Sequence, residues 1–430
     1  MKYKHHNIKL IYDPLWGLID VSGFLPMIDT PEFQALGFKY QLGVTSLLFP
    51  AATHTRKQHS FGAFKRTQML ADRWIHRGFI NEAEAKLMAA FALWHDIGHG
   101  PFSHVVEEVT KEMWGRDHDQ NGALIINKMK KAVESAGIDF KAFKELFDHK
   151  NPLYLAVHDK NLGAEKLDYL SRDAYYTIGE KPGVEYLADH TYFIDGKLMV
   201  DEKAIDNAKA LQEFYTKMYK MVYLRKNSVI AQRMVQKMVR KLLEAEPMNE
   251  GEFWALTDFG LLGKLENTPH ETVRKQAQKL LQRDLPRTAV ALKISKFADI
   301  EKRKDKAQTI FGITEEEMDK IIQSDHFKTP SRLEMVENEI ARLTGLPSES
   351  ILIVPPSSLT RFSPQDIDIY ISEGKTAKLS DYFAEHFRAL EEEGKSYSVM
   401  RVCTFKEHRE KLSEPKTARK VKEYLFSLVS

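Results

Sequence analysis

The chain has 430 residues, of which 43% are hydrophobic, enough for a buried core and for two or three domains. Its 63 lysines and arginines nearly balance 61 aspartates and glutamates, and the formal net charge of +2 excludes a global field that attracts nucleic acid or an anionic membrane. A single cysteine, Cys403, excludes an intramolecular disulfide framework. The N-terminus lacks the apolar segment of a signal peptide, and no apolar run approaches the roughly 20 residues that span a bilayer, so we expect a soluble, cytoplasmic protein without a membrane partner.

Two short stretches near either end of the first half predict β-hairpins. Residues 8–23, IKLIYDPLWGLIDVSG, alternate apolar and polar side chains around a Pro/Gly turn. Residues 191–201, TYFIDGKLMVD, repeat this pattern with Asp195-Gly196 at the tip. From Glu32 to about Glu246, most segments carry apolar residues three and four positions apart, which predicts a core of many helices.

The sequence pattern changes near residue 285. Highly charged helical sequence is followed by ILIVPP, DIDIYIS and YSVMRVCTF, which alternate or run apolar as strands do. We therefore expect a mainly α fold, with a helical domain over residues 1–285 and a smaller α+β domain over residues 286–430. The second domain offers no recognisable chemistry, and we assign it to assembly or regulation.

Histidines are concentrated between residues 54 and 118, where seven of the 16 occur. Neutral imidazole is the commonest transition-metal ligand and titrates near neutrality, so histidines gathered with carboxylates indicate a metal site with acid and base groups. The alternative is a set of ordinary core and surface histidines, which we favour for His54 and His76. The other five are His59, His95, His99, His104 and His118.

The adjacent pair His95-Asp96 argues most strongly for a metal site. Neighbours on a helix point about 100° apart, so both can reach one ion only near a helix end. Gly98 and Gly100 predict that end. A helix before it carries His59, and a set of imidazoles and carboxylates suits Mn, Fe, Zn or Mg.

The order of these motifs resembles the HD-domain phosphohydrolases, and most closely their deoxynucleoside triphosphate triphosphohydrolase branch. The likeness extends from about residue 8 to 295 and includes the phrases DTPEFQALGFKYQLGV and MYKMVYLRK. A second His-Asp dipeptide, at 158 and 159, is interpreted as a chance match. The motifs that carry the resemblance are Arg56-x-x-His59, His95-Asp96, GPFSH at 100–104, His118-Asp119-Gln120 and EKLDYLSRD at 165–173.

The resemblance implies an enzyme that hydrolyses dNTPs to deoxynucleoside and tripolyphosphate by attack of a metal-activated water on the α-phosphorus. It also implies a homo-oligomer, either a dimer or a tetramer. The divalent ion, whether Mn, Fe, Mg or Zn, would be held by His59, His95, Asp96 and Glu165. The catalytic residues would be His104, Glu107 and His118. The substrate-binding residues would be Gln41, Arg56, His99, Lys166, Tyr169, Asp173 and Tyr223. Among them, Arg56, His99 and Lys166 would contact phosphate, Gln41 and Asp173 the sugar 3′-hydroxyl, and Tyr223 would exclude a 2′-hydroxyl.

Four positions depart from the family pattern. Glu165 stands where the family normally has aspartate, and Glu107 stands where the family more often has aspartate. Tyr215 replaces an arginine that contacts the phosphate tail, which favours a shorter or different phosphate substrate. Gly37 replaces an arginine of the allosteric nucleotide pocket, so activation of that kind is not expected.

Two other functions stay open. One is an HD phosphohydrolase that acts on nucleoside monophosphates, cyclic nucleotides or nucleic-acid ends, which Tyr215 and Glu165 support. The other is a non-catalytic nucleotide sensor, which the full set of histidines disfavours. Nucleic acid is not an expected partner, because the chain lacks a basic stripe interleaved with stacking aromatics.

Overall fold

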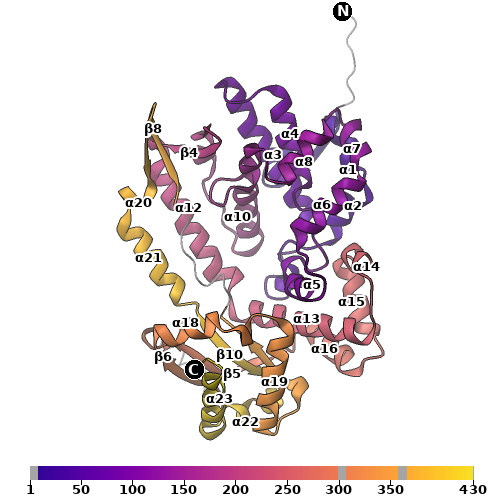
Figure 1. The fold of residues 1–430 in the computed structure, drawn as a ribbon, viewed down its shortest axis with the longest axis vertical. Helices are drawn as coiled ribbons and strands as arrows, with labels where there is room; N and C mark the ends of the chain where they lie inside the picture. Colours follow the sequence, from indigo (N-terminus) through magenta and orange to yellow (C-terminus); the bar gives the residue numbers. More distant parts are fainter. Residues whose placement is uncertain (1–7, 299–306, 357–365, 430) are drawn as a thin grey trace, which may run out of the picture.

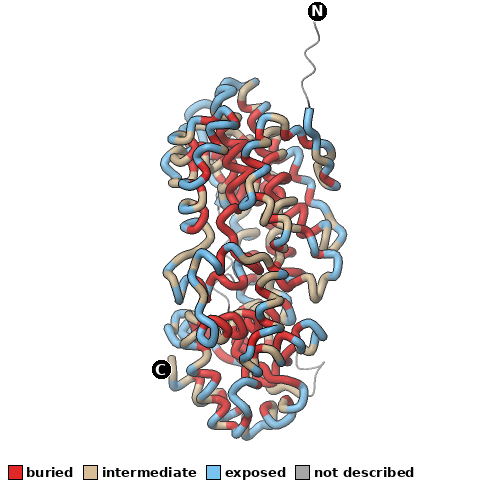
Figure 2. The backbone as a smooth tube through the Cα atoms, turned by 90° about the vertical axis from the view of Figure 1, so that its right-hand side faces the viewer, coloured by how far each residue is buried: buried red, intermediate tan, exposed pale blue. Residues whose placement is uncertain are grey.

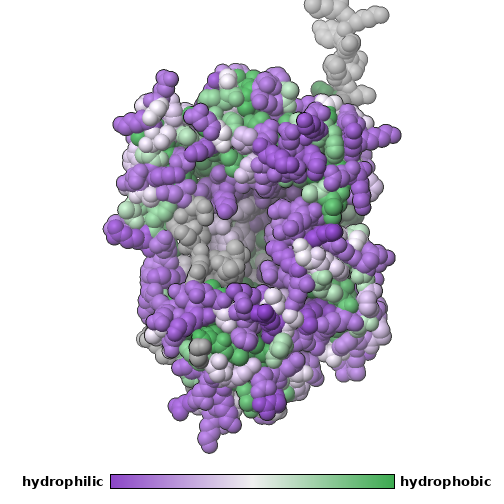
Figure 3. All heavy atoms as spheres, in the orientation of Figure 1, coloured by the Kyte–Doolittle hydropathy of each residue, from purple (hydrophilic) through white to green (hydrophobic). Residues whose placement is uncertain are grey.

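The computed structural model describes residues 8–298, 307–356 and 366–429. The N-terminal helices form one end of an elongated molecule, and a sheet covered by C-terminal helices forms the other (Figure 1). Buried backbone runs through the centre of both ends (Figure 2). On the face seen in Figure 3, hydrophilic side chains dominate and apolar ones show as small separate patches.

The N-terminal end is a bundle of helices with short connections. Three of them position the site: α3 (Arg56–His76), α4 (Glu82–Trp94) and α10 (Ala164–Thr177). Around them lie α1 (Leu25–Ile28), α2 (Pro31–Ala35), α5 (Glu107–Trp114), α6 (His118–Lys128), α7 (Lys130–Ser135), α8 (Phe140–Phe147), α9 (Leu155–His158) and α11 (Glu185–Asp189). The chain continues through α12 (Ile205–Met218), α13 (Lys226–Ala245), α14 (Glu250–Ala255), α15 (Asp258–Asn267) and α16 (Glu271–Leu281).

Side chains at the first turns fix where the site helices begin. Thr55 accepts from the amide of Gln58 at the start of α3, and the Gln58 side chain bonds back to the Thr55 amide. The same reciprocal cap joins Asp117 and Gln120 at the start of α6. Such caps satisfy amides that have no partner within the helix. As a result, α3 and α6 each begin one residue after the cap, with a site residue in the first turn.

Large apolar side chains from α3, α4 and α8 fill the core of this bundle. Trp74 and Trp94 are fully buried, and each indole nitrogen donates to a backbone carbonyl, that of Thr191 over 2.8 Å and that of Met27 over 3.2 Å. Phe91 packs edge-on against Phe147 with ring centroids 4.9 Å apart. Burying each such side chain contributes roughly 1.5–3 kcal/mol, so this core holds α3 and α4 rigidly beside the site.

Two hairpins occur where the sequence predicts them. Strands β1 (Leu10–Asp13) and β2 (Gly17–Asp20) pair antiparallel, as do β3 (Thr191–Ile194) and β4 (Lys197–Asp201). At the tip of the second hairpin Asp195 and Gly196 both have positive φ, of 50° and 73°. This is the backbone of the tight hairpin turns that Asp-Gly favours.

The C-terminal end is built on a four-stranded sheet in the order β6-β5-β10-β7. Its strands are β5 (Arg287–Ile294), β6 (Thr309–Ile313), β7 (Ile351–Val354) and β10 (Val399–Thr404). The helices of this end are α17 (Ser295–Ala298), α18 (Glu315–Gln323), α19 (Pro330–Thr344), α22 (Arg409–Ser413) and α23 (Pro415–Ser427). Strand β5 lies between two neighbours and is buried from its second residue onward, which accounts for its unbroken apolar sequence.

One C-terminal segment returns to the N-terminal end. Strand β8 (Asp368–Ser372) pairs parallel with β4, and β9 (Lys375–Lys378) pairs with β8, followed by α20 (Leu379–Tyr382) and α21 (Ala384–Lys395). Ile367 and Ile369 are buried in the same apolar core as α3 and α4. The chain therefore crosses the boundary expected near residue 285 a second time.

The predicted fold class, a helical body with small hairpins and a smaller α+β part, is confirmed. The three C-terminal segments predicted as strands form β7, β8 and β10. Strands β5, β6 and β9 were not predicted as strands. Among the described residues, no helix combines the length and apolarity needed to cross a membrane.

Candidate active site

Two imidazoles from different helices face each other in the helical body. His59 lies in the first turn of α3 and His95 directly follows α4, and their Nε2 atoms are 3.1 Å apart. His59 Nδ1 lies 2.8 Å from Asp168 Oδ2, and His95 Nδ1 lies 2.7 Å from the carbonyl oxygen of Ala92. Because each Nδ1 has an acceptor, each Nε2 is directed at the space between the rings, as in histidines that bind metals.

Asp96 completes a group of three ligand atoms, which we call the metal triad (His59, His95 and Asp96). Asp96 Oδ1 is 3.5 Å from His95 Nε2, and Asp96 Oδ2 is 3.9 Å from His59 Nε2. Burial alone would raise the pKa of Asp96, but Arg56, which donates to Oδ2 over 2.7 Å, and the nearby histidines hold it well below its usual range. The ligand atoms lie within 4.8 Å of one another. Two imidazole nitrogens with an ionised carboxylate fit a divalent cation.

The two triad histidines differ in their affinity for protons. Burial is the largest influence on both and lowers the pKa of each. For His59, the bond to Asp168 and the charge of Asp96 outweigh burial and raise the pKa, whereas for His95 burial prevails and the pKa is lowered. A cation at the triad therefore competes with one proton, on His59.

Glu165, predicted as the fourth metal ligand, lies near the metal triad and is partly exposed. Its Oε2 lies 2.5 Å from His158 Nδ1, and its side chain is 27% exposed. Burial would raise its pKa, but the charge and hydrogen bond of His158 lower it to about 2. The charge of Glu165 contributes to the raised pKa of His59 and partly opposes the lowering of the His95 pKa by burial. Glu165 is thus ionised and close to the triad, and its role as a ligand stays a prediction.

A second group of imidazoles adjoins the triad and is called the histidine cluster (His99, His104, Glu107 and His118). Glu107 Oε1 lies 2.6 Å from His118 Nδ1, 3.2 Å from His104 Nδ1 and 3.5 Å from His99 Nδ1. The rings of His99 and His118 stack with centroids 3.9 Å apart. The His104 side chain is 64% exposed, whereas His99 is buried. The structure therefore brings together all three predicted catalytic residues.

The loop that carries this cluster depends on close backbone contacts and on strain. A Cβ atom at Gly98 would lie 2.0 Å from the carbonyl oxygen of His118, and one at Gly100 would lie 2.9 Å from the ring of Trp254. Neither glycine has positive φ; the left-handed residues are Phe102 and Ser103, at 54° and 55°. Non-glycine residues pay for this conformation, and such strain concentrates at functional sites.

Two buried charged groups from distant elements hold the strained loop. Asp258, at the start of α15, accepts from the amides of Phe102 over 2.6 Å and Tyr40 over 2.8 Å. Lys39 Nζ donates to the carbonyl oxygen of His99 over 2.5 Å. Burial lowers the pKa of Lys39 to about 8, although Asp258 opposes the shift. The loop is thus tied at His99 and at Phe102, two residues before His104.

Asp173 is held between two rings. Tyr223 donates its hydroxyl to Asp173 Oδ2 over 2.7 Å, and His54 Nε2 lies 2.8 Å from Oδ1. Tyr223 ends a turn of π-helix, Tyr219–Tyr223, between α12 and α13. Burial and then the charge of Asp173 raise the Tyr223 pKa well above its usual range, so the phenol stays a donor. The backbone amide of Gln41 donates to the backbone carbonyl of His54 over 3.0 Å, which places Gln41 beside this group.

The predicted phosphate-binding cations, Arg56 and Lys166, differ in how many of their donors are already hydrogen-bonded within the protein. Arg56 donates through Nε to Ser103 and through Nη1 to Asp96, but its buried Nη2 makes no hydrogen bond with any described residue. Lys166 Nζ donates to the carbonyl oxygen of Lys160 over 2.5 Å and lies 3.8 Å from the ring centroid of Tyr215. Burial lowers the pKa of Lys166 to about 8. Tyr169 is half-buried, with its ring 6.4 Å from that of His59.

Comparison with known proteins relates this part of the chain to a known domain. Residues 56–173, which contain the metal triad, the histidine cluster and Asp173, match the family model of the HD domain. The chain therefore contains an HD domain. Residues 184–322 match a second family model, the HD associated region. The match to the HD domain ends at Asp173, within α10, and Tyr223 lies in the associated region.

Two relatives are similar to the HD domain and the sequence around it. A Dictyostelium discoideum protein named deoxynucleoside triphosphate triphosphohydrolase SAMHD1 homolog is 30% identical over 242 residues, 51% of this chain and 46% of that protein. The uncharacterized protein YwfO of Bacillus subtilis is 33% identical over 192 residues, 43% of this chain and 39% of that protein. The match spans less than half the length of each relative.

The whole architecture, HD domain included, occurs in solved structures. A phosphohydrolase from Bacteroides thetaiotaomicron superposes with a TM-score of 0.70 at 23% sequence identity, covering 93% of this chain and 100% of that one. At this identity the likeness shows the fold alone. The helical body and the C-terminal sheet thus form a fold that also occurs in another protein.

Three residues of the HD domain site or its surroundings were not predicted from sequence. Asp168 orients His59 and accepts from Arg172, with Nε 3.0 Å from Oδ2. His54, interpreted as an ordinary histidine, bonds to Asp173, and His158, interpreted as a chance match, bonds to Glu165. The local signal for Asp168 is its position within EKLDYLSRD; only the tertiary structure shows the roles of the other two.

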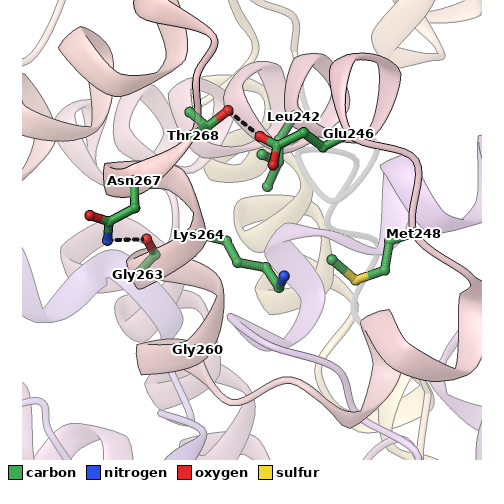
Figure 4. A pocket seen from close by; sticks show the side chains of 8 residues that line it. All are labelled: Leu242, Glu246, Met248, Gly260, Gly263, Lys264, Asn267 and Thr268. Atoms are coloured by element: carbon green, nitrogen blue, oxygen red, sulfur yellow. Dashed lines mark hydrogen bonds between the residues drawn. The ribbon is translucent and has the colours of Figure 1, made fainter.

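A further pocket lies apart from these groups, between α13 and α15 (Figure 4). Glu246 accepts there from the Thr268 hydroxyl, and Asn267 donates to the carbonyl oxygen of Gly263 over 2.8 Å. No residue of the metal triad or the histidine cluster lines this pocket.

Proposed function

We propose that this protein is a metal-dependent phosphohydrolase that converts dNTPs to deoxynucleoside and tripolyphosphate. The observation that carries the proposal is the contact between the metal triad and the histidine cluster. His99 joins them, with Nε2 3.3 Å from Asp96 Oδ1 and Nδ1 3.5 Å from Glu107 Oε1. A phosphate bound here meets metal ligands on one side and a proton donor on the other, which are the two requirements for hydrolysis of a phosphate ester.

The metal triad would hold the cation, and Glu165 would add a second carboxylate. When bound, a divalent cation lowers the pKa of a water and neutralises charge on phosphate oxygens. Asp168 and the Ala92 carbonyl keep both imidazoles turned with Nε2 toward the ligand position. Arg56 fixes the Asp96 carboxylate, so the ligand set is oriented before substrate arrives.

Arg56 also offers a hydrogen-bond donor to the substrate. Nε and Nη1 are engaged by Ser103 and Asp96, which holds the guanidinium plane still and leaves the buried Nη2 without a described partner. A buried charged donor without an acceptor is costly unless a ligand completes it. A phosphate oxygen is the acceptor that guanidinium groups prefer.

His118 is suited to act as the general acid. Burial alone would lower its pKa, but Glu107 outweighs burial and raises it, so the imidazole is protonated at higher pH than an ordinary histidine. Protonated imidazole can donate to the leaving 5′-oxygen. His104, exposed beside the same carboxylate, can exchange protons with solvent and restore the acid.

Asp173 and Tyr223 are suited to select the sugar. The two carboxylate oxygens of Asp173 already face His54 and Tyr223. Asp173 could accept a further hydrogen bond from a hydroxyl of the sugar. Gln41 Oε1 is buried without a hydrogen bond among described residues and would accept from the same hydroxyl. Tyr223, fixed by its bond to Asp173, would exclude a 2′-hydroxyl by its bulk. This preference for deoxyribose would distinguish dNTPs from rNTPs.

Tyr215 and Lys166 favour a second candidate, hydrolysis of a nucleotide with a shorter phosphate chain. Lys166 is engaged by the Lys160 carbonyl and lies over the ring of Tyr215. Of the two cations expected to contact a triphosphate tail, the family's arginine is replaced by Tyr215, and Lys166 is already hydrogen-bonded within the protein. A monophosphate would need only Arg56 and the metal triad.

Product analysis tests the proposal. Purified protein is incubated with Mn²⁺ or Mg²⁺ and each of the four dNTPs, the four rNTPs and the matching monophosphates, and products are resolved by chromatography. Deoxynucleoside and tripolyphosphate, with rNTPs spared, is the expected result. Turnover of monophosphates alone would favour the second candidate, and no turnover with either metal would contradict both.

A further inference from the structure

The N-terminal hairpin lies outside the residues that match the HD domain, yet its turn contacts the helices of that domain. At the turn, Asp13 Oδ1 accepts from the amides of Leu15 over 2.9 Å and Trp16 over 3.0 Å. Such bonds from an aspartate to amides two or three residues on fix a tight turn. The turn places the Trp16 indole against α10, where its nitrogen donates to Asp168 Oδ1.

Asp168 is the carboxylate that orients His59, and both of its oxygens are engaged within the protein. Asp168 Oδ2 lies 2.8 Å from His59 Nδ1 and accepts from Arg172 Nε over 3.0 Å. Asp168 Oδ1 accepts from Trp16 and, over 3.0 Å, from Arg172 Nη2. Asp168 is 0% exposed, so water does not compete for these bonds. Trp16 and Arg172 together therefore set where the carboxylate stands and which way His59 Nε2 points.

Asp13 also holds Arg172. Arg172 Nη1 donates to Asp13 Oδ2 over 2.9 Å, and both side chains are buried. Burial would lower the pKa of Arg172, but Asp168 and Asp13 outweigh burial and raise it, so the guanidinium stays charged. Hydrogen bonds and the turn thus close a ring that runs from Asp13 through Trp16, Asp168 and Arg172. Buried networks in which every member is satisfied are rigid.

The ring of Trp16 is held by two cations. The Arg66 guanidinium lies 4.9 Å from the ring centroid, and Lys181 Nζ lies 4.7 Å from it. Arg66 is 3% exposed, and its buried Nη2 makes no hydrogen bond with any described residue. The attraction between a cation and the face of an indole is strongest where water is excluded. The contact with Trp16 accounts for this otherwise unpaired arginine and keeps the indole N–H directed at Asp168.

Helix α3 leaves space for the Asp168 carboxylate at Gly62. A Cβ atom at position 62 would lie 1.9 Å from Asp168 Oδ1 and 2.3 Å from Arg172 Nη2. Glycine in a helix interior is less favourable than alanine. The close approach of the carboxylate to the backbone of α3 explains why glycine stands there, one turn after His59.

We propose that the turn of the N-terminal hairpin positions His59 for the cation, and that Trp16 is the residue through which it acts. Trp16 is a positioning residue, because it acts on His59 through Asp168. Without the indole N–H, Asp168 Oδ1 loses one of its two donors and the carboxylate can turn away from His59 Nδ1. The imidazole then loses the acceptor that fixes its tautomer and its direction. The inference rests on the proposed function in placing a cation at the metal triad, and it is independent of which nucleotide is hydrolysed.

Metal affinity tests the inference without recourse to activity. Mn²⁺ is titrated by calorimetry into chelator-treated full-length protein, unmodified or carrying Trp16→Phe or Trp74→Phe. Trp16→Phe keeps an aromatic ring beside Arg66 but loses the N–H, and its dissociation constant for Mn²⁺ should rise about tenfold. This is the lower end of the range for partners of metal ligands, because Arg172 still holds Asp168.

Trp74→Phe is the matched control. It makes the same chemical change in α3, the helix of His59, and removes the indole bond to the Thr191 carbonyl oxygen. Its melting temperature should fall while its Mn²⁺ dissociation constant stays that of the unmodified protein. An equal rise in the dissociation constants of both variants would show a general loss of stability and overturn the inference.

The remaining outcomes separate this inference from the proposed function. A Trp16→Phe protein that binds Mn²⁺ as tightly as the unmodified one would overturn the inference and leave the metal centre intact. No binding by the unmodified protein would contradict the metal centre, and the inference with it. If Trp16→Phe does not fold, Gly62→Ala replaces it, because the new Cβ displaces the Asp168 carboxylate while alanine favours the helix. Its dissociation constant should rise at least about tenfold; an unchanged value would overturn the inference.

Discussion

His158 Nδ1 lies 2.5 Å from Glu165 Oε2, and the His158 ring stands edge-on to His95 with centroids 5.6 Å apart. Glutamate has one methylene and one torsion more than aspartate, so its carboxylate needs a partner to hold it in one place. His158 supplies that partner on the side facing the metal triad. The departure from aspartate at position 165 and the histidine at 158 are thus parts of one arrangement.

His158→Ala should therefore weaken cation binding at the triad. Loss of a residue that orients a ligand typically lowers metal affinity about 10- to 100-fold. Mn²⁺ affinity measured by calorimetry is the readout, with His76→Ala as the control because His76 lies at the other end of α3 from His59 and bonds to the carbonyl oxygen of Asp72. Equal affinity of His158→Ala and the unmodified protein would show that Glu165 is held by other means or is not a ligand.

Gly98→Ala should disrupt the histidine cluster. The added Cβ would lie 2.0 Å from the His118 carbonyl oxygen and 2.4 Å from the Gly122 amide nitrogen, both backbone atoms of α6. The helix must move away, which we expect to cost about 2 kcal/mol of unfolding free energy. Thermal unfolding and turnover are measured together. Gly263→Ala, in α15 with nothing within 4 Å of the new atom, should leave both unchanged or slightly raise stability; the same result for Gly98→Ala would contradict the close contact.

Tyr223 provides a test of sugar selection. Tyr223→Phe removes the hydrogen bond to the Asp173 carboxylate but keeps the ring, so kcat/KM for dNTPs should fall about tenfold while rNTPs remain excluded. Tyr223→Ala removes the ring as well and should admit rNTPs. The ratio of kcat/KM for matched dNTP and rNTP pairs measures this. A ratio that is the same in the unmodified protein and Tyr223→Ala would remove the tyrosine from its proposed role.

The Glu107–His118 pair should make stability depend on pH in chelator-treated protein. Burial would lower the pKa of His118, but Glu107 outweighs burial and raises it from its usual 6.5. The stabilisation of the folded state by protonated His118 is therefore fully present below pH 6.5 and is lost as pH rises through the raised pKa. Burial would raise the pKa of Glu107, but His104 and His118 together outweigh burial and lower it from 4.5, so its contribution is present above pH 4.5 and is lost as pH falls. Both are present between pH 4.5 and 6.5.

The melting temperature of Glu107→Gln should therefore fall furthest below that of the unmodified protein within this window. Melting curves at about pH 5.5 and about pH 9 are compared for the two proteins, with Glu108→Gln as the control. A difference that is larger at the alkaline end would reverse the expected sign and contradict the ionisation states given to the pair.

Local patterns were sufficient for much of the fold and of the site. The two hairpins were predicted because alternation and Asp-Gly or Pro/Gly turns are local signals, and the end of α4 at His95-Asp96 because glycines follow it. Strand β5 was missed because a central strand is apolar on both faces and shows no alternation. The return of β8 to β4 could not be predicted, since pairing between residues 200 and 369 leaves no mark in either strand alone.

The same limit applies to the site. His54 and His158 each have an unremarkable sequence context, and their bonds to Asp173 and Glu165 arise from packing of separate helices. The glycines at 98 and 100 were expected to turn the chain, yet they permit close contact with α6 and Trp254, while Phe102 and Ser103 take the left-handed backbone. Sequence indicates which residue types gather; only tertiary structure shows which atoms face each other.

The measurement that tests the central claim most directly is the fate of solvent oxygen. A dNTP is hydrolysed in water enriched in ¹⁸O with Mn²⁺ present, and the products are weighed by mass spectrometry. Attack on the α-phosphorus predicts one ¹⁸O in tripolyphosphate and none in the deoxynucleoside. Label in a deoxynucleoside mono- or diphosphate, or in the nucleoside itself, would contradict the account.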